Sequence, residues 1–573
     1  MLENLKKPSF RKKLKQIDLV AFISIALVIV VSITMFTIYF FPLYPDEIQA
    51  RLMLSRLPYD FPKKISALPT CLANFFQPIP ETMYLPGFIN WALHGRLESP
   101  YALRQVGFLV AFSWAGWLAY YLNYRAKNSL LKGKGLLISG PQGLYMVGFI
   151  ISIFFIGVFP IFLIVNRNEQ FIMPSVVLLI TVFLISSHLG SKGHLWQKML
   201  LAALYFVAAS LVLYVHAKGL FLTPFLILVC WQLFGHFKSR LPLVFGMTLL
   251  VLHVVLAFFA FKYVFQCSET PLVDEMLKSF SLDPALILYD PRQFIEMAYH
   301  SLLQFPKYMH QLGFQEQTDA AYLPSLPLTV SAELANIFIK LNVVATFFTL
   351  LFFLPFQYYR KDVVSGRVVT ANLVLLVLFV CVLISAIFNL PKNWYDAGYL
   401  YALLLITLVF FIGENYSGIF KISAARKIFL YLGAVALLSQ AVFIHRNLPA
   451  FMEGYAGPGV SIVKYDQTKT RDDLVAASRA CNIDPVLSTK VVIDDYTYLF
   501  FQKSKSPMAI SYIWLGNDDK SIRQFFSKVD SDGLIVACSG ILSPYIAIVK
   551  REGNICCIPR KELKNLLSLP PPA

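Results

Sequence analysis

Charged side chains are scarce in this chain: Asp, Glu, Lys and Arg make up 14% of its 573 residues, whereas 57% of the residues are hydrophobic. This balance excludes an ordinary soluble domain. The apolar residues gather in repeated, uninterrupted runs, each long enough to cross the roughly 30 Å hydrocarbon core of a bilayer. Because helices satisfy their own backbone hydrogen bonds in lipid, the sequence predicts an α-helical polytopic membrane protein.

The chain also lacks low-complexity tracts, convincing short repeats and a cleavable signal peptide. Its basic first residues lead into an apolar run over residues 18–41. This run is too long for the apolar part of a signal peptide, and no small-residue cleavage site follows it. We expect it to be the first transmembrane helix.

Acidic residues are fewer than basic ones, 33 against 50, which gives a formal net charge of +17. An excess of this size invites a nucleic-acid partner, but the basic residues occur in short clusters between alternate apolar runs. That distribution is typical of the cytoplasmic loops of membrane proteins. We therefore predict no nucleic-acid partner and a chain embedded in membrane lipid.

The apolar runs predict about eleven transmembrane helices. They lie near residues 18–41, 105–122, 141–165, 172–188, 199–214, 221–236, 242–265, 336–357, 370–388, 397–413 and 427–445. With a cytoplasmic N-terminus, every inner connection is basic, the inner residues being Arg125, Lys127, Lys132, Lys134, Lys192, Lys198, Lys238, Arg240, Arg360, Lys361, Arg367, Lys421, Arg426 and Lys427. We expect this orientation, in a plasma membrane of the bacterial inner-membrane type.

Three long segments then lie on the outer face: residues 42–104, 266–335 and 446–573. The last alternates helical patterns (TRDDLVAASRA, DKSIRQFFSKV) with strand-like ones (KVVIDD, DGLIVAC, YIAIVK). Alternation of this kind indicates a small α/β domain. We therefore divide the chain into a transmembrane module, residues 1–445, which includes the first two outer segments, and an extracytoplasmic α/β domain, residues 446–573.

Six of the eight cysteines fall on the outer side: Cys71, Cys267, Cys481, Cys538, Cys556 and Cys557. An oxidising compartment permits disulfides there. The spacing fits no metal-binding motif, and it leaves both the pairing and the alternative of free buried thiols open.

Ionisable side chains recur at the outer ends of the predicted helices, where four connections carry them. The stretches are FPLYPDEIQARLML with Asp46 and Glu47, NRNEQF with Arg167 and Glu169, YVHAKGLFLTP with His216 and Lys218, and NLPKNWYDAGYLYA with Lys392, Tyr395, Asp396 and Tyr399. Ionisable groups near hydrocarbon are costly and tend to be functional where they converge.

Each stretch also has a structural explanation. Asp46, with Gln49 three residues later, fits the N-cap and capping box of a surface helix. Arg167 and Glu169 fit a solvated pair. The basic residues at helix ends fit snorkelling, and the aromatic residues near Asp396 fit an interfacial belt.

Taken together, these groups suit transfer of a sugar from a lipid-linked phosphate. A phosphate leaving group needs positive charge and hydrogen-bond donors, which Arg167, His216, Lys218 and Lys392 supply. The incoming hydroxyl is a poor nucleophile and needs a carboxylate to accept its proton. Asp46 is the candidate base.

The acidic pair directly after the first helix resembles the signature of the GT-C superfamily of membrane glycosyltransferases, in particular the protein O-mannosyltransferase and aminoarabinose transferase branch. The sequence PDE at 45–47, the long first outer loop, Glu169 in the second outer loop, KNWYDAGY at 392–399 and the outer C-terminal domain carry the likeness.

The resemblance implies a polyprenyl-phosphate-linked sugar as donor and an envelope glycan, lipid or protein as acceptor, with inversion at the anomeric carbon. It implies Asp46 as general base, Glu47 as an orienting or acceptor-binding residue, and Glu169 as a substrate ligand. Where members of the superfamily bind a divalent cation, Asp46 and Glu169 would be its ligands; no other cofactor is implied.

Two alternatives remain open on the sequence. An O-antigen polymerase or ligase would depend on basic residues of the late outer loop, here Arg292, Lys307 and His310, and not on Asp46. A flippase or transporter would place ionisable groups and broken helices near the bilayer midplane, whereas the helix interiors of this sequence carry few charges.

Overall fold

The structure is a computed structural model of the chain. It describes residues 8–40, 102–131, 142–165, 168–237, 239–264, 282–283, 285–309, 312–314, 326–363, 369–388, 394–419, 422–453, 455–457, 460–462, 467–484, 491–493, 497, 508–509, 532–538 and 549–562.

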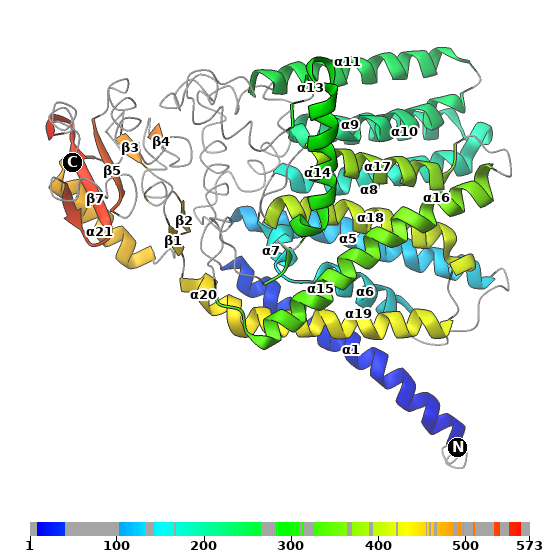
Figure 1. Cartoon of the computed structure of the whole chain (residues 1–573), viewed down its shortest axis with the longest axis horizontal. Helices are drawn as coiled ribbons and strands as arrows, with labels where there is room; N and C mark the ends of the chain where they lie inside the picture. The colour runs from blue at the N-terminus through cyan, green and yellow to red at the C-terminus, as the bar shows by residue number, and fades with distance from the viewer. Residues whose placement is uncertain are drawn as a thin grey trace.

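Most of the described residues form a bundle of long, roughly parallel helices (Figure 1). A helix occupies each predicted apolar run: α1 (Pro8–Tyr39), α5 (Ala102–Leu131), α6 (Gln142–Phe154) with α7 (Phe159–Ile164), α8 (Ile172–Leu189), α9 (Leu195–Val215), α10 (Thr223–Gly235), α11 (Leu241–Val264), α15 (Val330–Phe348), α17 (Ala371–Phe388), α18 (Trp394–Ile419) and α19 (Ile422–Val442). Within the described ranges, eight helical segments are long and apolar enough to cross a membrane. The chain is an integral membrane protein, as predicted.

Two of these helices continue beyond their α-helical part. The first, α15, runs on through η7 (Thr349–Phe353), α16 (Leu354–Gln357) and η8 (Tyr358–Val363), and α19 runs on through η9 (Phe443–Asn447) and α20 (Leu448–Glu453). The helical segment after α19 therefore extends past residue 445, where the sequence had suggested a domain boundary.

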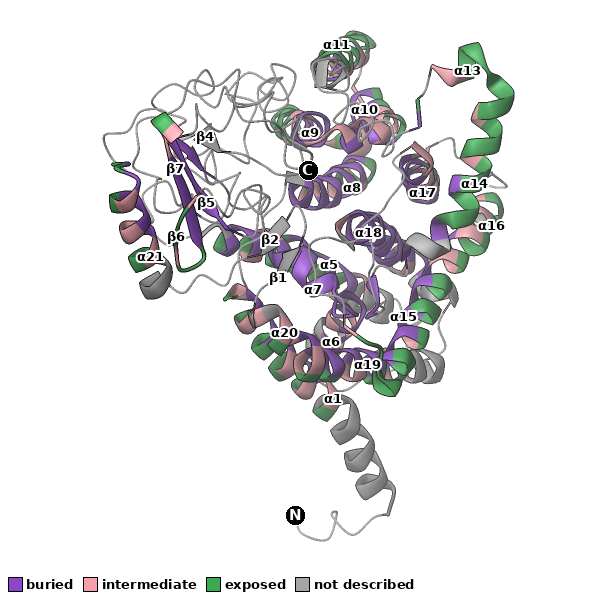
Figure 2. Cartoon of the chain, turned by 60° about the vertical axis from the view of Figure 1, so that its left-hand side comes forward, coloured by how far each residue is buried: buried purple, intermediate pink, exposed green. Residues whose placement is uncertain are grey.

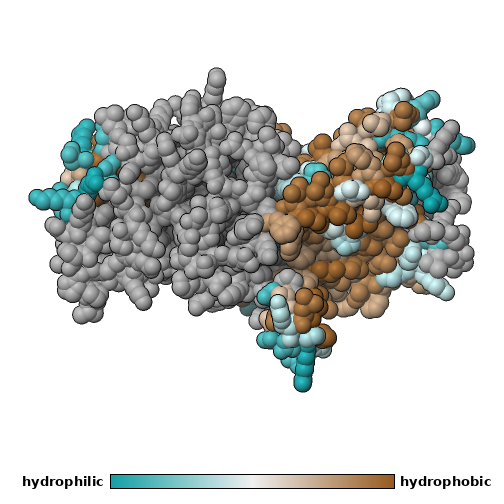
Figure 3. Space-filling model, turned by 90° about the horizontal axis from the view of Figure 1, so that it is seen from above, coloured by the Kyte–Doolittle hydropathy of each residue, from teal (hydrophilic) through white to brown (hydrophobic). Residues whose placement is uncertain are grey.

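The core of the bundle lies around α8, α17 and α18, which are largely buried and lie near one another (Figure 2). Helices at the periphery expose large apolar side chains instead; on α11, Val244 is 60% exposed and Phe258 is 51% exposed. Figure 3 shows apolar residues covering this face of the helical part, with polar residues gathered toward the end remote from the sheet. An apolar exterior of this kind is what lipid contact requires.

The run predicted as one helix over 141–165 is broken between α6 and α7. Gly157 has a left-handed φ of 50°, and a Cβ at this position would lie 1.6 Å from the Leu312 carbonyl oxygen. The Gly157 N–H donates to Ser439 Oγ at 2.6 Å, and Gln440 Nε2 donates to the Phe155 carbonyl at 3.3 Å. Polar side chains of α19 thus satisfy the backbone groups that the break would leave unpaired in lipid.

A shorter helix, α14 (Pro291–Met309), crosses the long helices near one end of the bundle (Figure 1). Its buried residues form one stripe along the helix. Because successive residues of a helix are 100° apart, the exposed residues divide into an apolar flank on one side of this stripe and a polar flank on the other. The buried residues include Ser301, Phe305 and Met309, the apolar flank Ile295, Tyr299 and Leu302, and the polar flank Glu296 and His300. This pattern is typical of a helix lying along a water–hydrocarbon boundary.

The C-terminal part contains a sheet, which lies beyond one end of the bundle (Figure 1). Its strand order is β4-β3-β5-β7-β6. The strands are β3 (Val491–Ile493), β4 (Met508–Ala509), β5 (Gly533–Ala537), β6 (Lys550–Glu552) and β7 (Ile555–Pro559), accompanied by α21 (Gln467–Ala480) and a hairpin of β1 (Tyr455–Gly457) and β2 (Val460–Ile462). The pair β3–β5 is parallel, whereas β7 is antiparallel to β5 and β6.

The predicted fold class, a helical polytopic membrane protein with a small C-terminal α/β region, is confirmed. The patterns KVVIDD, DGLIVAC and TRDDLVAASRA correspond to β3, β5 and α21. The pattern DKSIRQFFSKV lies outside the described residues, as does YIAIVK except for Val549 and Lys550, the latter being the first residue of β6.

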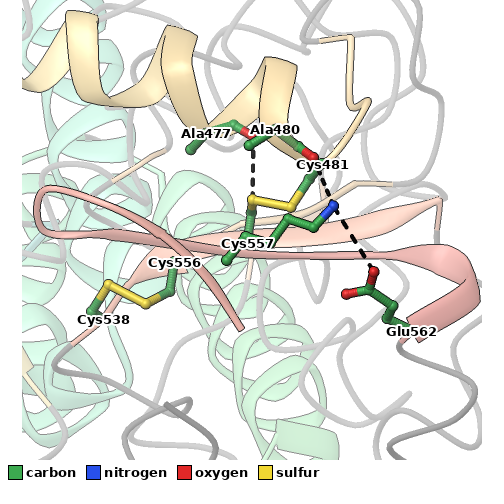
Figure 4. Close-up of a disulfide and its surroundings, with 8 residues drawn as sticks. Ala477, Ala480, Cys481, Cys538, Cys556, Cys557 and Glu562 are labelled. Carbon is green, nitrogen blue, oxygen red and sulfur yellow. Dashed lines mark hydrogen bonds and ion pairs between the residues drawn. A yellow bond between two sulfur atoms is a disulfide. The ribbon is translucent and has the colours of Figure 1, made fainter. Parts of the chain in front are cut away.

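Two disulfides fix this sheet, and both end on neighbouring residues of β7 (Figure 4). Cys557 bonds to Cys481 at the end of α21, and Cys556 bonds to Cys538 after β5. Successive side chains of a strand point to opposite faces, so one disulfide ties the helix to the sheet and the other ties two strands on the opposite face. Cys71 and Cys267 lie outside the described residues.

We expect non-reducing peptide mapping to recover the pairs 481–557 and 538–556, because the alternation along β7 directs the two thiols to different partners. Partial reduction followed by differential alkylation separates the two bonds, which adjacent cysteines would otherwise keep in one peptide. The exchanged pairs, 481–556 and 538–557, would contradict this strand register.

Candidate functional site

Glu169 lies in η3 (Asn168–Phe171), the short connection between α7 and α8. The neighbouring Gln170 holds this turn against the end of α7. Its Nε2 donates to the Phe162 carbonyl at 2.6 Å and also to the Val165 carbonyl. A buried amide that bonds two helix-end carbonyls removes unpaired groups and fixes the backbone that carries Glu169.

Lys218 lies in η5 (Ala217–Leu222), between α9 and α10. His216 caps this turn, because its Nδ1 accepts from the Lys218 backbone N–H at 3.2 Å. The turn folds tightly onto α9 at Gly219, where a Cβ would lie 1.7 Å from the Val212 carbonyl oxygen. Glycine at this position therefore sets the direction in which the Lys218 side chain enters the bundle.

Asp396 lies in the first turn of α18, at the same end of the bundle. Gly398 allows that turn to approach α7, because a Cβ at Gly398 would lie 2.7 Å from the Phe162 ring. The same α7 residue thus contacts both the η3 turn, through its carbonyl, and α18, through its ring. This packing brings Asp396 toward Glu169.

The three connections meet at the Lys218 ammonium. Its Nζ lies 3.2 Å from Glu169 Oε1 and 2.5 Å from Asp396 Oδ1. His216 Nε2 lies 3.5 Å from the same Glu169 oxygen. We call these four residues the outer polar cluster, after the side of the membrane that the sequence predicts for their connections. They come from three stretches, and Glu169 and Asp396 are 227 positions apart in the sequence.

Two aromatic rings also lie close to the ammonium. Lys218 Nζ lies 5.7 Å from the ring centroid of Tyr395 and 5.4 Å from that of Tyr399. Cations within about 6 Å of a ring centroid are attracted by the ring quadrupole. The ammonium is therefore held by two carboxylates and two tyrosine rings.

The charges of the cluster are buried. Glu169 is 2% exposed, Lys218 7% and Asp396 8%. Two carboxylates facing one ammonium leave a formal charge of −1 when the imidazole is neutral. Removing water from such groups is tolerated only when each is paired and hydrogen-bonded, so the three side chains depend on one another.

The cluster does not fit a divalent cation on Glu169. The Lys218 ammonium lies 3.2 Å from Glu169 Oε1. A metal ion bound about 2.1 Å from the same oxygen would lie within about 5 Å of the ammonium. The two cations would then repel each other by roughly 7 kcal/mol at an effective dielectric constant near 20. Among the described side chains, no three His, Cys, Asp or Glu residues are grouped so as to hold a metal ion. Asp46, the other metal ligand implied by the resemblance, lies outside the described residues.

Six of the ten predicted site residues come together here: Glu169, His216, Lys218, Tyr395, Asp396 and Tyr399. The other four, Asp46, Glu47, Arg167 and Lys392, lie outside the described residues. Arg167 precedes Glu169 by two positions, and Lys392 precedes Asp396 by four.

Two arginines at this end of the bundle were missed by the sequence analysis. Arg104 is 1% exposed, and its Nη1 donates to the carbonyls of Ile38 and Tyr39 at 2.9 Å each, which caps the end of α1. Arg446 Nη2 donates to the Leu326 carbonyl at 2.5 Å, and burial lowers its pKa. No local signal pointed to this role of Arg104, because it lies in the first turn of α5, whereas the carbonyls that it caps belong to α1, more than 60 positions earlier.

No protein-family model matches the chain, and no curated protein matches it. Among solved structures, the archaeal oligosaccharyltransferase AglB from Archaeoglobus fulgidus, in complex with an inhibitory peptide and a dolichol-phosphate, aligns with 11% sequence identity and a TM-score of 0.41. The alignment covers 91% of this chain and 71% of that chain. A likeness of this size establishes neither a shared fold nor a shared activity, so the function is argued from the site.

Proposed function

We propose that the chain is an inverting membrane glycosyltransferase of GT-C type. It moves a hexosyl or pentosyl group from a polyprenyl-phosphate donor to an envelope glycan, lipid or protein on the outer face of the membrane. The observation that carries the proposal is the outer polar cluster, in which charged groups from three connections meet at one end of the bundle. Convergence of costly ionisable groups at a membrane boundary is typical of a functional site.

The orientation rests on two features. The sheet at this end of the bundle contains two disulfides, which form and persist in oxidising compartments. The connections at the opposite end carry the basic residues that favour a cytoplasmic side. The N-terminus is therefore cytoplasmic, and the C-terminal domain, residues 446–573, lies outside, where it contacts the acceptor.

The reaction is a single displacement. Asp46 accepts the proton of the acceptor hydroxyl, whose oxygen bonds to the anomeric carbon as the bond from that carbon to the phosphate oxygen breaks. The phosphate leaves with the electron pair of that bond. Only one carboxylate on the acceptor side is needed, whereas a double displacement would require a second carboxylate as nucleophile. Glu47 orients Asp46 or binds the acceptor.

The leaving phosphate needs positive charge. The ammonium of Lys218 is shared with two carboxylates, so we assign the main phosphate contacts to Arg167 and Lys392. These residues adjoin Glu169 and Asp396 in the sequence. Lys218 positions the turns that carry Glu169 and Asp396, and His216 provides a further hydrogen-bond donor beside them. Tyr395 and Tyr399 line the cluster.

The flippase alternative has one observation in its favour. The break between α6 and α7 is a discontinuous helix of the kind found at transporter binding sites. Uncharged side chains, Ser439 and Gln440, satisfy this break, whereas the ionisable groups gather at the outer helix ends. Accumulation of a lipid-linked sugar across liposomes without a new glycosidic bond would favour this alternative.

The proposal predicts that polyprenyl phosphate stabilises the purified protein and that Arg167→Ala with Lys392→Ala removes the effect. A ligand that binds only the native state raises the apparent melting temperature in a concentration-dependent way. Thermal-shift titration in detergent measures it. Arg292→Ala is the matched control, because Arg292 is an exposed basic residue of another outer segment, and it pairs with Glu296 of its own helix.

Stabilisation retained in Arg292→Ala and lost in the double variant supports the assignment. The reverse pattern would favour the polymerase or ligase alternative, which relies on the late outer loop; the side chains of its other residues, Lys307 and His310, lie outside the described part of the chain. No stabilisation in any form of the protein would contradict a polyprenyl-phosphate substrate.

A further inference from the structure

The centre of the outer polar cluster is a cation that the chain supplies itself. Lys218 Nζ is within 3.2 Å of a Glu169 oxygen and 2.5 Å of an Asp396 oxygen. These two carboxylates come from different helices, and the ammonium lies between them. A divalent metal ion bridging the same carboxylates would compete with the ammonium for the space between them.

The two tyrosine rings beside the ammonium favour an organic cation over a metal ion. The rings of Tyr395 and Tyr399 lie within 5.7 Å of Nζ. Aromatic faces attract weakly hydrated organic cations, whereas hard divalent ions select oxygen ligands and retain water. Two carboxylates together with two aromatic rings therefore suit an alkylammonium group.

We propose that this arrangement is an ammonium cage, formed by Glu169, Asp396, Tyr395 and Tyr399, in which Lys218 is the resident cation and which binds no divalent metal ion. The polar organisation at this end of the bundle is then independent of metal supply. The inference concerns the cage alone and stands whether or not the chain transfers a sugar.

The first test is metal binding by the wild-type protein. Purified protein, stripped with a chelator, is titrated with Mn²⁺ and followed by electron paramagnetic resonance and by thermal shift, in parallel with Glu169→Gln. We expect no bound Mn²⁺ that depends on Glu169. A bound Mn²⁺ that is lost in Glu169→Gln would overturn the proposal, and this measurement does not depend on whether a Lys218 variant folds.

The second test is chemical rescue of Lys218→Ala. This substitution removes three methylene groups and the ammonium, which together correspond to n-propylammonium. We expect n-propylammonium to raise the melting temperature of the variant, with a shift that grows with the logarithm of its concentration and that is absent in wild type. Propanol, which has the shape without the charge, and tetramethylammonium, which has the charge without N–H donors, are the matched controls.

The rescue is expected to be weaker in the Lys218→Ala, Glu169→Gln double variant, because one carboxylate of the cage is then neutral. Stabilisation of Lys218→Ala by Mn²⁺ that exceeds the effect of n-propylammonium would show a general divalent site and overturn the proposal. A folded variant that n-propylammonium does not stabilise would also overturn it. All these readouts are independent of glycosyl transfer, so failure of the cage and failure of the proposed activity are separate results.

Discussion

Lys218→Ala is expected to lower the stability of the bundle by about 3–5 kcal/mol, because it removes the ammonium that two buried carboxylates share. Glu169 and Asp396 are less than 10% exposed, so solvent cannot replace the lost ion pairs. They also lie close enough to the same ammonium to repel each other once it is gone. Thermal or denaturant unfolding in a fixed detergent measures the change.

The controls separate charge from volume. Neutralising the whole set, with Lys218→Met, Glu169→Gln and Asp396→Asn together, is expected to restore most of the stability, since replacing a complete buried ion pair by neutral groups costs far less than breaking it. Lys192→Ala, at an exposed position of the opposite end, is expected to change stability by less than about 0.5 kcal/mol. If Lys218→Ala is as stable as wild type, the buried ion pairs are not formed.

The sequence was enough to predict most residues of this cluster, but not the distances between them. Helix alternation places Glu169, His216, Lys218 and Asp396 on one side of the membrane, because each follows or precedes a full apolar run. The sequence gives no distance between them. That depends on how closely the turns approach the helices, and Gly219 and Gly398 permit those approaches. The sharing of one ammonium between two carboxylates follows from this packing.

The break between α6 and α7 was missed for a different reason. Hydropathy is continuous across residues 141–165, so the run predicts one helix. The local signals for an interruption were a glycine, Gly157, and Pro160 three residues later. Proline fits the first turn of a helix better than its interior, and α7 begins at Phe159. The compensating partners, Ser439 and Gln440, lie more than 280 positions away, where no local pattern points to them.

The disulfides were also predictable only in part. The predicted topology favoured an oxidising compartment for these cysteines, whereas their pairing required the register of β7 against β5. Val536 lies opposite Cys556, and Ile535 lies opposite Cys557. A shift by one residue would exchange the faces of both cysteines.

Asp46→Asn is expected to reduce glycosyl transfer by about 10²–10⁴-fold, the contribution typical of a general base. The amide keeps the size and hydrogen-bonding reach of the carboxylate but cannot accept the proton of the acceptor hydroxyl. Because the base acts on the acceptor, polyprenyl phosphate should stabilise the variant as it does wild type. The loss should appear in kcat more than in the KM for the donor, measured as initial rates in proteoliposomes at equal protein content.

Variants of residues near Asp46 test the same role. Arg104 fixes the last carbonyls of α1, seven positions before Asp46 in the sequence, so Arg104→Gln should weaken stability and transfer together, whereas Asp46→Asn should affect transfer alone. Glu47→Gln serves as the neighbouring control and should retain more activity than Asp46→Asn. Transfer at wild-type rate by folded Asp46→Asn would remove Asp46 from the base role and leave it as the N-cap of a surface helix.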